Sequence, residues 1–162
     1  MVIADSSVLI PLMRIGKLHL LKDFFGEICI TKDIYEEVKS GKSGASEFEK
    51  ACSDWIKIKE INNKEILNKI AFSEDIEKPD ASIIQLAEMN KETILSNDYL
   101  LILVAKTKNI KCWWLTTFLL NCLIKKIITK IEAKSILLEL INAGLRLNNQ
   151  VYAAILEEIE KL

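Results

Sequence analysis

Short apolar runs and longer segments with helical spacing alternate along the chain. The runs predict five strands, over residues 2–4, 27–30, 55–58, 93–96 and 110–113. In the segments between them, apolar residues recur every three or four positions, as Leu9, Leu12 and Met13 do, which predicts amphipathic helices. A repeated strand–helix order is typical of an α/β fold, in which a parallel sheet is covered by helices.

Capping residues and turn formers predict where several of these elements begin and end. Ser6 or Ser7 is predicted to cap the first helix, and Thr31 is predicted to cap a later one. Pro79 fits the first turn of another helix, where its missing N–H costs nothing. Residues 40–44, which are rich in serine and glycine, form the clearest loop of the chain.

The C-terminal part of the chain is entirely helical in its pattern. Helices are predicted over residues 117–126, 131–143 and 149–161. No linker or shift of composition divides the chain, so we expect one domain spanning residues 1–162. In that domain, residues 1–115 form the α/β core with the candidate site, and residues 116–162 add the C-terminal helices.

Composition and charge narrow the possible functions. The chain has 162 residues, a net charge of −1 and only two arginines, Arg14 and Arg146, so no global positive field points to nucleic acid or a membrane. Its four cysteines lack metal-ligand spacing and are predicted to be reduced thiols. The first residues lack signal-peptide features, and the least polar window, 112–124, is too short to span a bilayer. We therefore expect a cytoplasmic protein with no membrane partner.

Four acidic residues are notable for their positions relative to the apolar runs. Asp5 and Asp98 each follow a predicted strand, and the carboxyl ends of neighbouring parallel strands border one crevice. Asp80, in the first turn of one helix, and Glu37, at the edge of the apolar face of another, can complete a cluster. Carboxylates without histidine or cysteine suit Mg²⁺ or Mn²⁺, and such a site is typical of phosphodiester hydrolysis.

Each of these acids also has an ordinary structural interpretation. Asp5 and Asp98 fit helix N-caps, and Asp80 fits the positive end of a helix dipole. Glu37 fits a solvated member of the acidic pair that it forms with Glu36, and Glu36 would replace it in the cluster if the helix were rotated. Spacing alone leaves the metal cluster and these alternatives open.

Five segments of the chain resemble the PIN domain family of ribonucleases, and within it the VapC-type toxins. They are residues 2–10, 28–38, 79–87, 94–100 and 143–147. The first four resemble the strand and helix segments that each bring one acid of the family's site, here Asp5, Glu37, Asp80 and Asp98. The last segment is similar to a prokaryotic PIN subgroup with extra C-terminal helices. The resemblance covers nearly the whole chain.

This resemblance implies a three-layer α/β/α fold, RNA cleavage with Mg²⁺ or Mn²⁺, and commonly a homodimer. The metal ligands that it implies are Asp5, Asp80 and Asp98. Glu37 would complete the cage and orient the nucleophilic water, and the hydroxyls of Ser7 and Ser96 would hydrogen-bond the ligating carboxylates. As a toxin, the protein would also bind an antitoxin protein.

Two departures from the family pattern affect the expected site. Asn97 stands where relatives often have a further acid, which weakens the case for a second metal ion. Trp113 and Trp114 occupy a stretch that is small and glycine-containing in many relatives, and we favour packing in the core or a dimer over stacking on RNA bases. The alternative function is a catalytically silent PIN-like module that binds RNA or protein, which the presence of all four acids disfavours.

Overall fold

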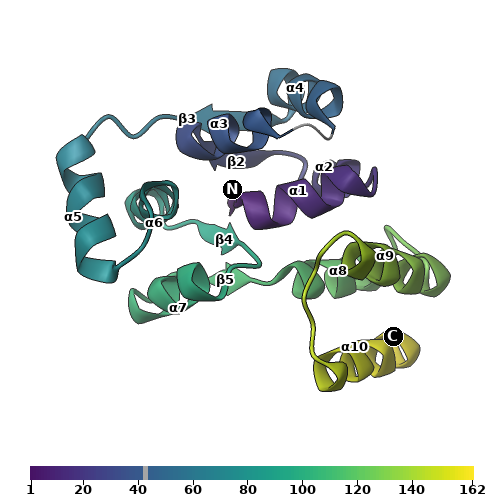
Figure 1. Cartoon of the computed structure of the whole chain (residues 1–162). Coiled ribbons are helices and arrows are strands. Elements are labelled where there is room, and N and C mark those ends of the chain that lie inside the picture. Colours follow the sequence, from purple (N-terminus) through teal and green to yellow (C-terminus); the bar gives the residue numbers. More distant parts are fainter. Residues whose placement is uncertain (42–43) are drawn as a thin grey trace.

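The computed structural model describes residues 1–41 and 44–162 and contains a five-stranded parallel sheet flanked by helices (Figure 1). The strands are β1 (Val2–Ala4), β2 (Ile28–Thr31), β3 (Ile56–Lys59), β4 (Thr93–Leu95) and β5 (Cys112–Trp113). The helices of the described residues are α1 (Ser6–Arg14), α2 (His19–Phe25), α3 (Lys32–Ser40), α4 (Ala45–Asp54), α5 (Lys64–Glu74), α6 (Lys78–Asn90), α7 (Tyr99–Thr107), α8 (Leu115–Ile124), α9 (Lys130–Asn142) and α10 (Asn149–Lys161). Residues 42 and 43, in the loop predicted over 40–44, lie outside the described residues.

The strands are ordered β3-β2-β1-β4-β5, and every neighbouring pair is parallel. The chain builds one half of the sheet outward from β1 and then returns to add β4 on the other side of β1. In register, Val2 of β1 lies opposite Ile28 of β2 and Thr93 of β4. Ligands of such sheets bind beyond the carboxyl ends of the strands where the order reverses, which here are β1 and β4. The predicted α/β fold with a parallel sheet is confirmed.

Hydrophobic burial explains which apolar runs form the centre of the sheet. Every residue of β1 and β2 is buried, as expected for strands that have helices over both faces. The edge strand β3 alternates isoleucine with lysine, and only Ile56 is buried there. Lysine on an edge strand also opposes pairing with a second chain.

The cap of the first helix differs from the prediction. Helix α1 begins at Ser6, and its N-cap is Asp5, whose Oδ1 accepts a hydrogen bond from the Ser6 backbone N–H at 2.7 Å. The prediction of Ser6 or Ser7 as the cap was wrong, and the alternative interpretation of Asp5 as an N-cap is confirmed, because the helix already begins at Ser6 and a carboxylate caps as well as a hydroxyl does. Thr31 caps α3 as predicted, and Pro79 lies in the first turn of α6.

The three predicted C-terminal helices correspond to α8, α9 and α10, which gather at one side of the molecule (Figure 1). They share one hydrophobic core with the sheet, and Phe118 of α8 packs on Phe24 and Phe25 of α2. Trp113 belongs to this aromatic cluster, with its ring centroid 5.8 Å from that of Phe24. The predicted packing role of Trp113 therefore has partners within the chain, while Trp114 is half-buried at the N-cap of α8.

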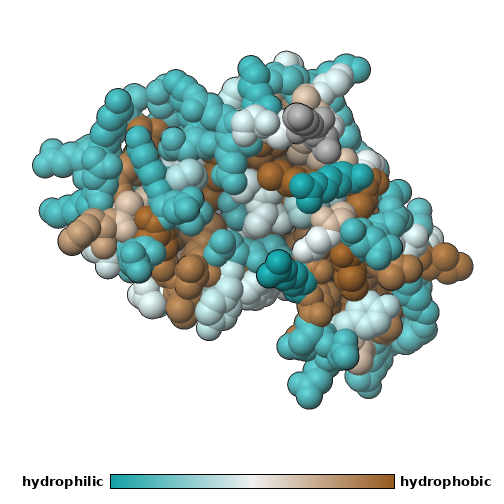
Figure 2. All heavy atoms as spheres, viewed as in Figure 1, coloured by the Kyte–Doolittle hydropathy of each residue, from teal (hydrophilic) through white to brown (hydrophobic). Residues whose placement is uncertain are grey.

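Apolar side chains also reach the surface over α7 and over the group of α8 to α10 (Figure 2). On α7 the exposed residues are Tyr99, Leu100 and Leu103. On α9 they are Ile131 and Leu138. Exposed apolar side chains that lie on one helix are candidates for contact with a partner, because isolated ones scattered over a surface are ordinary.

The four cysteines are free thiols, as predicted. Burial raises the pKa of Cys29 to about 11 and that of Cys122 to about 12, so both thiols stay protonated and unreactive near neutral pH. Among the described residues, no helix combines the length and the apolarity needed to cross a membrane.

Candidate metal centre

All four acids predicted from the sequence line one cavity of about 430 Å³ at the carboxyl end of the sheet. Asp5 directly follows β1, and Asp98 follows β4 at the point where the strand order reverses. Glu37 reaches the cavity from α3, and Asp80 from the first turn of α6. We call it the acidic cavity.

Asp5 is the most tightly held of these acids, since only 3% of it is exposed. Its backbone N–H donates to the carbonyl of Leu95, which ties it to the end of β4. Its Oδ1 accepts from the Ser6 N–H, and its Oδ2 accepts from the hydroxyls of Ser7 at 2.5 Å and Ser96 at 2.9 Å. A carboxylate has about four acceptor positions, so these three short hydrogen bonds leave about one for a ligand.

The two serine hydroxyls have a fixed direction of donation. The Ser7 hydroxyl accepts from the backbone N–H of Asn97 at 2.8 Å, and the Ser96 hydroxyl accepts from the backbone N–H of Asp98 at 2.9 Å. Each serine has one proton to give, and each gives it to Asp5. This network holds Asp5 in place as an acceptor of both hydroxyl protons, so Ser7 and Ser96 make hydrogen bonds to one of the four acids.

Asp98 caps a helix, as one interpretation of the sequence expected, and it also lines the acidic cavity. Its Oδ1 accepts from the Leu101 N–H at 3.0 Å and caps α7. The side chain also lines the acidic cavity, and it has a second carboxylate oxygen that is not needed for the cap. Capping holds this acid in place for a ligand, because it fixes the orientation of the carboxylate.

Glu37 is held by a residue that the sequence indicated only as a possible cap. The hydroxyl of Ser6 donates to Glu37 Oε1 at 2.9 Å, and the same hydroxyl lies 3.4 Å from Asp5 Oδ1. Burial raises the pKa of Glu37, as do the charges of Asp5 and Glu77, while the hydrogen bond from Ser6 lowers it. Glu36 lines a different cavity, so the rotated-helix alternative does not hold.

Asp80 shows the electrostatic character of the acidic cavity. Its pKa is raised to about 7, first by burial and then by the charges of Asp5, Asp98, Glu77 and Glu37. The described residues that line the cavity include no lysine or arginine to offset these charges. Each of the other three predicted acids contributes to the shift, so all three lie within electrostatic reach of Asp80.

Two further acids of the cavity were missed by the sequence analysis. Asp75 and Glu77, in the connection between α5 and α6, also line it. Asp75 adopts the left-handed conformation, with φ of 53°, at the end of α5. The signal in the sequence was the density of acids over residues 74–80, which precedes and includes Asp80. Six carboxylates therefore line one cavity.

A buried hydrogen bond fixes the two helices that carry Glu37 and Asp80. The hydroxyls of Thr31 and Ser82 lie 2.8 Å apart, and both residues are at most 1% exposed. Thr31 Oγ1 also accepts from the N–H of Ile34 and so caps α3, while Ser82 belongs to α6. This contact sets the position of α3 relative to α6.

Replacing Thr31 with valine is expected to destabilise the protein by about 1–3 kcal/mol, since the substitution removes a helix cap and leaves the buried Ser82 hydroxyl without this partner. Thermal unfolding of the wild type, Thr31→Val and Thr31→Ser measures the effect. The serine variant keeps the hydroxyl and should unfold close to the wild-type temperature. Equal stability of the valine variant and the wild type would show that this hydroxyl does not hold the helices.

The donor set of the acidic cavity fits a hard divalent cation. Six carboxylates line it, and oxygen is the ligand atom that Mg²⁺ and Mn²⁺ prefer. Within residues 1–41 and 44–162, no three acidic, histidine or cysteine side chains converge closely enough to ligate one ion directly. Because Mg²⁺ retains several waters when carboxylates hold it, Asp5, Asp80 and Asp98 fit this ion through direct and water-bridged contacts together.

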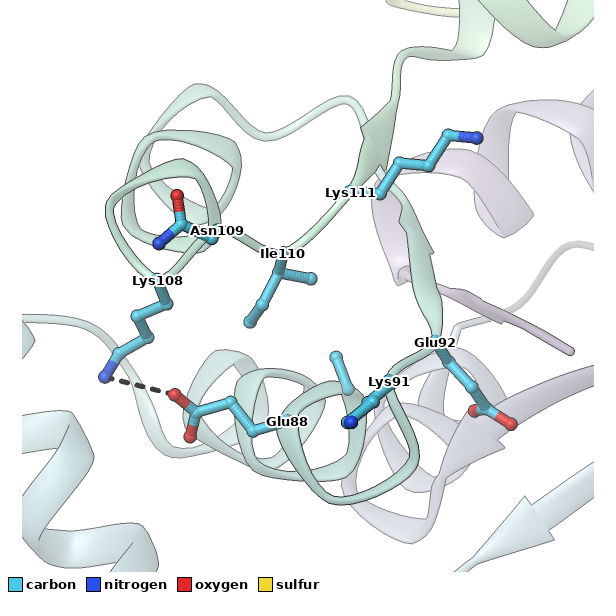
Figure 3. A pocket seen from close by; sticks show the side chains of 8 residues that line it. Glu88, Lys91, Glu92, Lys108, Asn109, Ile110 and Lys111 are labelled. Carbon is cyan, nitrogen blue, oxygen red and sulfur yellow. Dashed lines mark ion pairs between the residues drawn. The ribbon is translucent and has the colours of Figure 1, made fainter.

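A second cavity of similar volume, about 430 Å³, lies at the opposite end of the sheet (Figure 3). It lies between the ends of α6 and α7 and contains none of the four predicted acids. Its Lys108 pairs with Glu88 at 3.4 Å, and Glu92 points away from Ile110. These charges neutralise one another, so this cavity lacks the concentrated negative charge of the acidic cavity.

The comparison with protein families agrees with this geometry. A family model described as "DUF3368: PIN domain" matches residues 1–161. The chain therefore belongs to the PIN domain family, whose members are typically nucleases. The match does not distinguish the VapC-type toxins, so that narrower assignment stays a prediction.

Among solved structures, the chain is similar to the crystal structure of PAE2754 from Pyrobaculum aerophilum. The TM-score is 0.54 and the sequence identity 19%, over 68% of this chain and 87% of that chain. At this identity the likeness shows a shared fold. No curated protein matches the chain significantly.

Proposed function

We propose that the protein is an endoribonuclease that depends on Mg²⁺ or Mn²⁺. The observation that carries this proposal is the acidic cavity, in which six carboxylates lie at the strand switch point of a PIN domain. Without a cation, this cavity would repel a phosphodiester substrate, and its negative charges, together with burial, which has the larger effect, raise the pKa of Asp80. A cation would make the cavity attractive to RNA.

Under this proposal the residues of the acidic cavity have two roles, which are to hold the cation and to accept a proton from the attacking water. Asp5, Asp80 and Asp98 hold the cation, with Asp5 and Asp98 fixed by hydrogen bonds to backbone and serine groups. The cation lowers the pKa of water and stabilises negative charge on the attacked phosphate. Glu37, oriented by Ser6 and with a raised pKa, accepts the proton of the attacking water as it approaches phosphorus in line with the leaving oxygen.

Removal of divalent metal is expected to abolish cleavage. A pool of fluorescent single-stranded RNAs incubated with the protein should yield fragments with Mg²⁺ or Mn²⁺ and roughly 100-fold fewer or none with EDTA, because the carboxylates alone repel the substrate. Adding Mg²⁺ back should restore the fragments. Cleavage that persists in EDTA would contradict the proposed chemistry. Binding of RNA without any cleavage would instead favour the catalytically silent PIN-like module.

We also propose, from the sequence resemblance, that the protein is the toxin of a type II toxin–antitoxin pair, acts in the cytoplasm and forms a homodimer. The exposed apolar residues Tyr99, Leu100 and Leu103 on α7 support a protein contact close to the acidic cavity, which Leu100 also lines. Light scattering of the purified protein would test the dimer. A monomer at micromolar concentration would contradict it.

A further inference from the structure

A separate cavity of about 340 Å³ adjoins the acidic cavity on the far side of the first turn of α1. Ser6 and Ser7 line both cavities, so the two are direct neighbours. Helix α1 forms one wall of this neighbouring cavity, with Pro11 and Arg14 lining it. The opposite wall is the connection between α9 and α10, where residues 143–145 line it. We call it the arginine cavity.

The only two arginines of the chain, 132 residues apart in sequence, both lie at this connection: Arg14 lines the cavity, and Arg146 directly follows the lining residues 143–145. Arg14 Nη1 donates to the carbonyl of Ala143 at 3.2 Å, and Arg146 lies in the same connection three residues further on. Both are exposed, so most of their donor groups face solvent. The other 20 basic residues of the chain are lysines, so the chain has no arginine anywhere else.

The two adjoining cavities have opposite electrostatic character. Six carboxylates line the acidic cavity, whereas the described residues that line the arginine cavity include Arg14 and no acid. A cation in the acidic cavity would neutralise charge only at the scissile phosphate. The neighbouring phosphates of an RNA strand therefore need positive groups beside the site, and the guanidinium fork matches a phosphate in geometry and charge.

The lining of the arginine cavity also suits the rest of a nucleotide. Ile10, Pro11 and Leu145 are apolar surfaces against which a base or ribose can pack. The cavity thus offers a cation and apolar surfaces together.

We propose that the arginine cavity binds the nucleotide next to the scissile phosphate of a single-stranded RNA, with Arg14 and Arg146 contacting its phosphates. This inference rests on the proposed ribonuclease function. Under this proposal the segment of residues 143–147 helps to position the RNA. The C-terminal helices that this segment connects then form part of the substrate-binding surface. Arg14 and Arg146 are positioning residues, since the chemistry takes place in the acidic cavity.

Binding of a fluorescent single-stranded RNA to Arg14→Gln, Arg146→Gln and the double variant tests the proposal. Fluorescence anisotropy in Mg²⁺, with every protein also carrying Asp98→Asn to prevent cleavage, gives the dissociation constants. Each arginine variant should bind roughly tenfold more weakly. The slope of log K against log salt should fall by about 0.7 for each arginine removed. Lys106→Gln is the matched control, because this exposed lysine lies at the far end of α7 from Asp98 and lines neither cavity.

The outcomes separate this inference from the proposed function. If the parent chain with Asp98 intact cleaves RNA in Mg²⁺ and the double variant binds RNA like the control, the arginine cavity is not a nucleotide site, although the ribonuclease stands. If the parent chain neither binds nor cleaves RNA, both proposals fail. Among the described residues, Arg146 has no hydrogen-bond partner, so its variant reports on binding even if Arg14→Gln, which removes the bond to Ala143, loosens the connection.

Discussion

Asp98→Asn is expected to lower the rate of RNA cleavage by roughly 100- to 1,000-fold while leaving the melting temperature almost unchanged. The amide oxygen of asparagine can accept the hydrogen bond from the Leu101 N–H that now goes to Asp98 Oδ1, so the cap of α7 survives. The substitution removes one negative charge from the acidic cavity, and with it one proposed ligand of the cation. Cleavage kinetics and thermal unfolding of the same preparation measure both effects.

A matched control for this substitution is Asp23→Asn, on the exposed surface of α2, which removes the same charge outside the cavity. It should cleave RNA like the wild type. Asp5→Asn would be a less clean test, because an amide NH₂ cannot accept the hydroxyl protons that Ser7 and Ser96 now donate to Asp5. Full activity of Asp98→Asn would show that this acid is not part of the site, and it would contradict the proposal that Asp98 helps to hold the cation.

The fold could be predicted from local pattern, and local pattern together with the family resemblance predicted that the four acids would meet in one cavity. Apolar β-forming runs followed by an acid, as in residues 2–5 and 94–98, determine a strand end and the position of its carboxylate together. Once such strands are parallel, their acids must lie at one edge of the sheet. The grouping of Asp5 and Asp98 is therefore a consequence of topology.

Other features of the site depend on contacts that no local pattern reveals. Ser6 was interpreted as a cap, and its hydrogen bond to Glu37 requires α1 and α3 to lie side by side. In the sequence Glu77 is one acid among many, and only the folded connection between α5 and α6 places it at the cavity. The meeting of Arg14 with Ala143 spans almost the entire chain, so only the folded structure brings the two together. Tertiary packing decides these three cases.

The largest effect on the metal-free protein is expected from Asp80. Its pKa rises from 3.8 to about 7 on folding, so the folded state binds more protons than the unfolded state between these values. Stability should therefore fall as the pH rises from about 4 to 7, and the loss should be complete above about pH 7. Asp80→Asn removes the titration, and the variant should melt several degrees above the wild type at pH 8 in EDTA.

The pH dependence of the difference in melting temperature between Asp80→Asn and the wild type shows whether the ionisation of Asp80 causes that difference. The advantage of Asp80→Asn over the wild type should shrink as the pH falls from 8 to 5, because protonation then relieves the same repulsion in the wild type. Asp23→Asn should show no such trend. Added Mg²⁺ should stabilise the wild type most at pH 8, where Asp80 is ionised, and should stabilise the variant less. A constant difference at every pH would mean that folding does not raise the pKa of Asp80, and the electrostatic argument for a cation in the acidic cavity would fail with it.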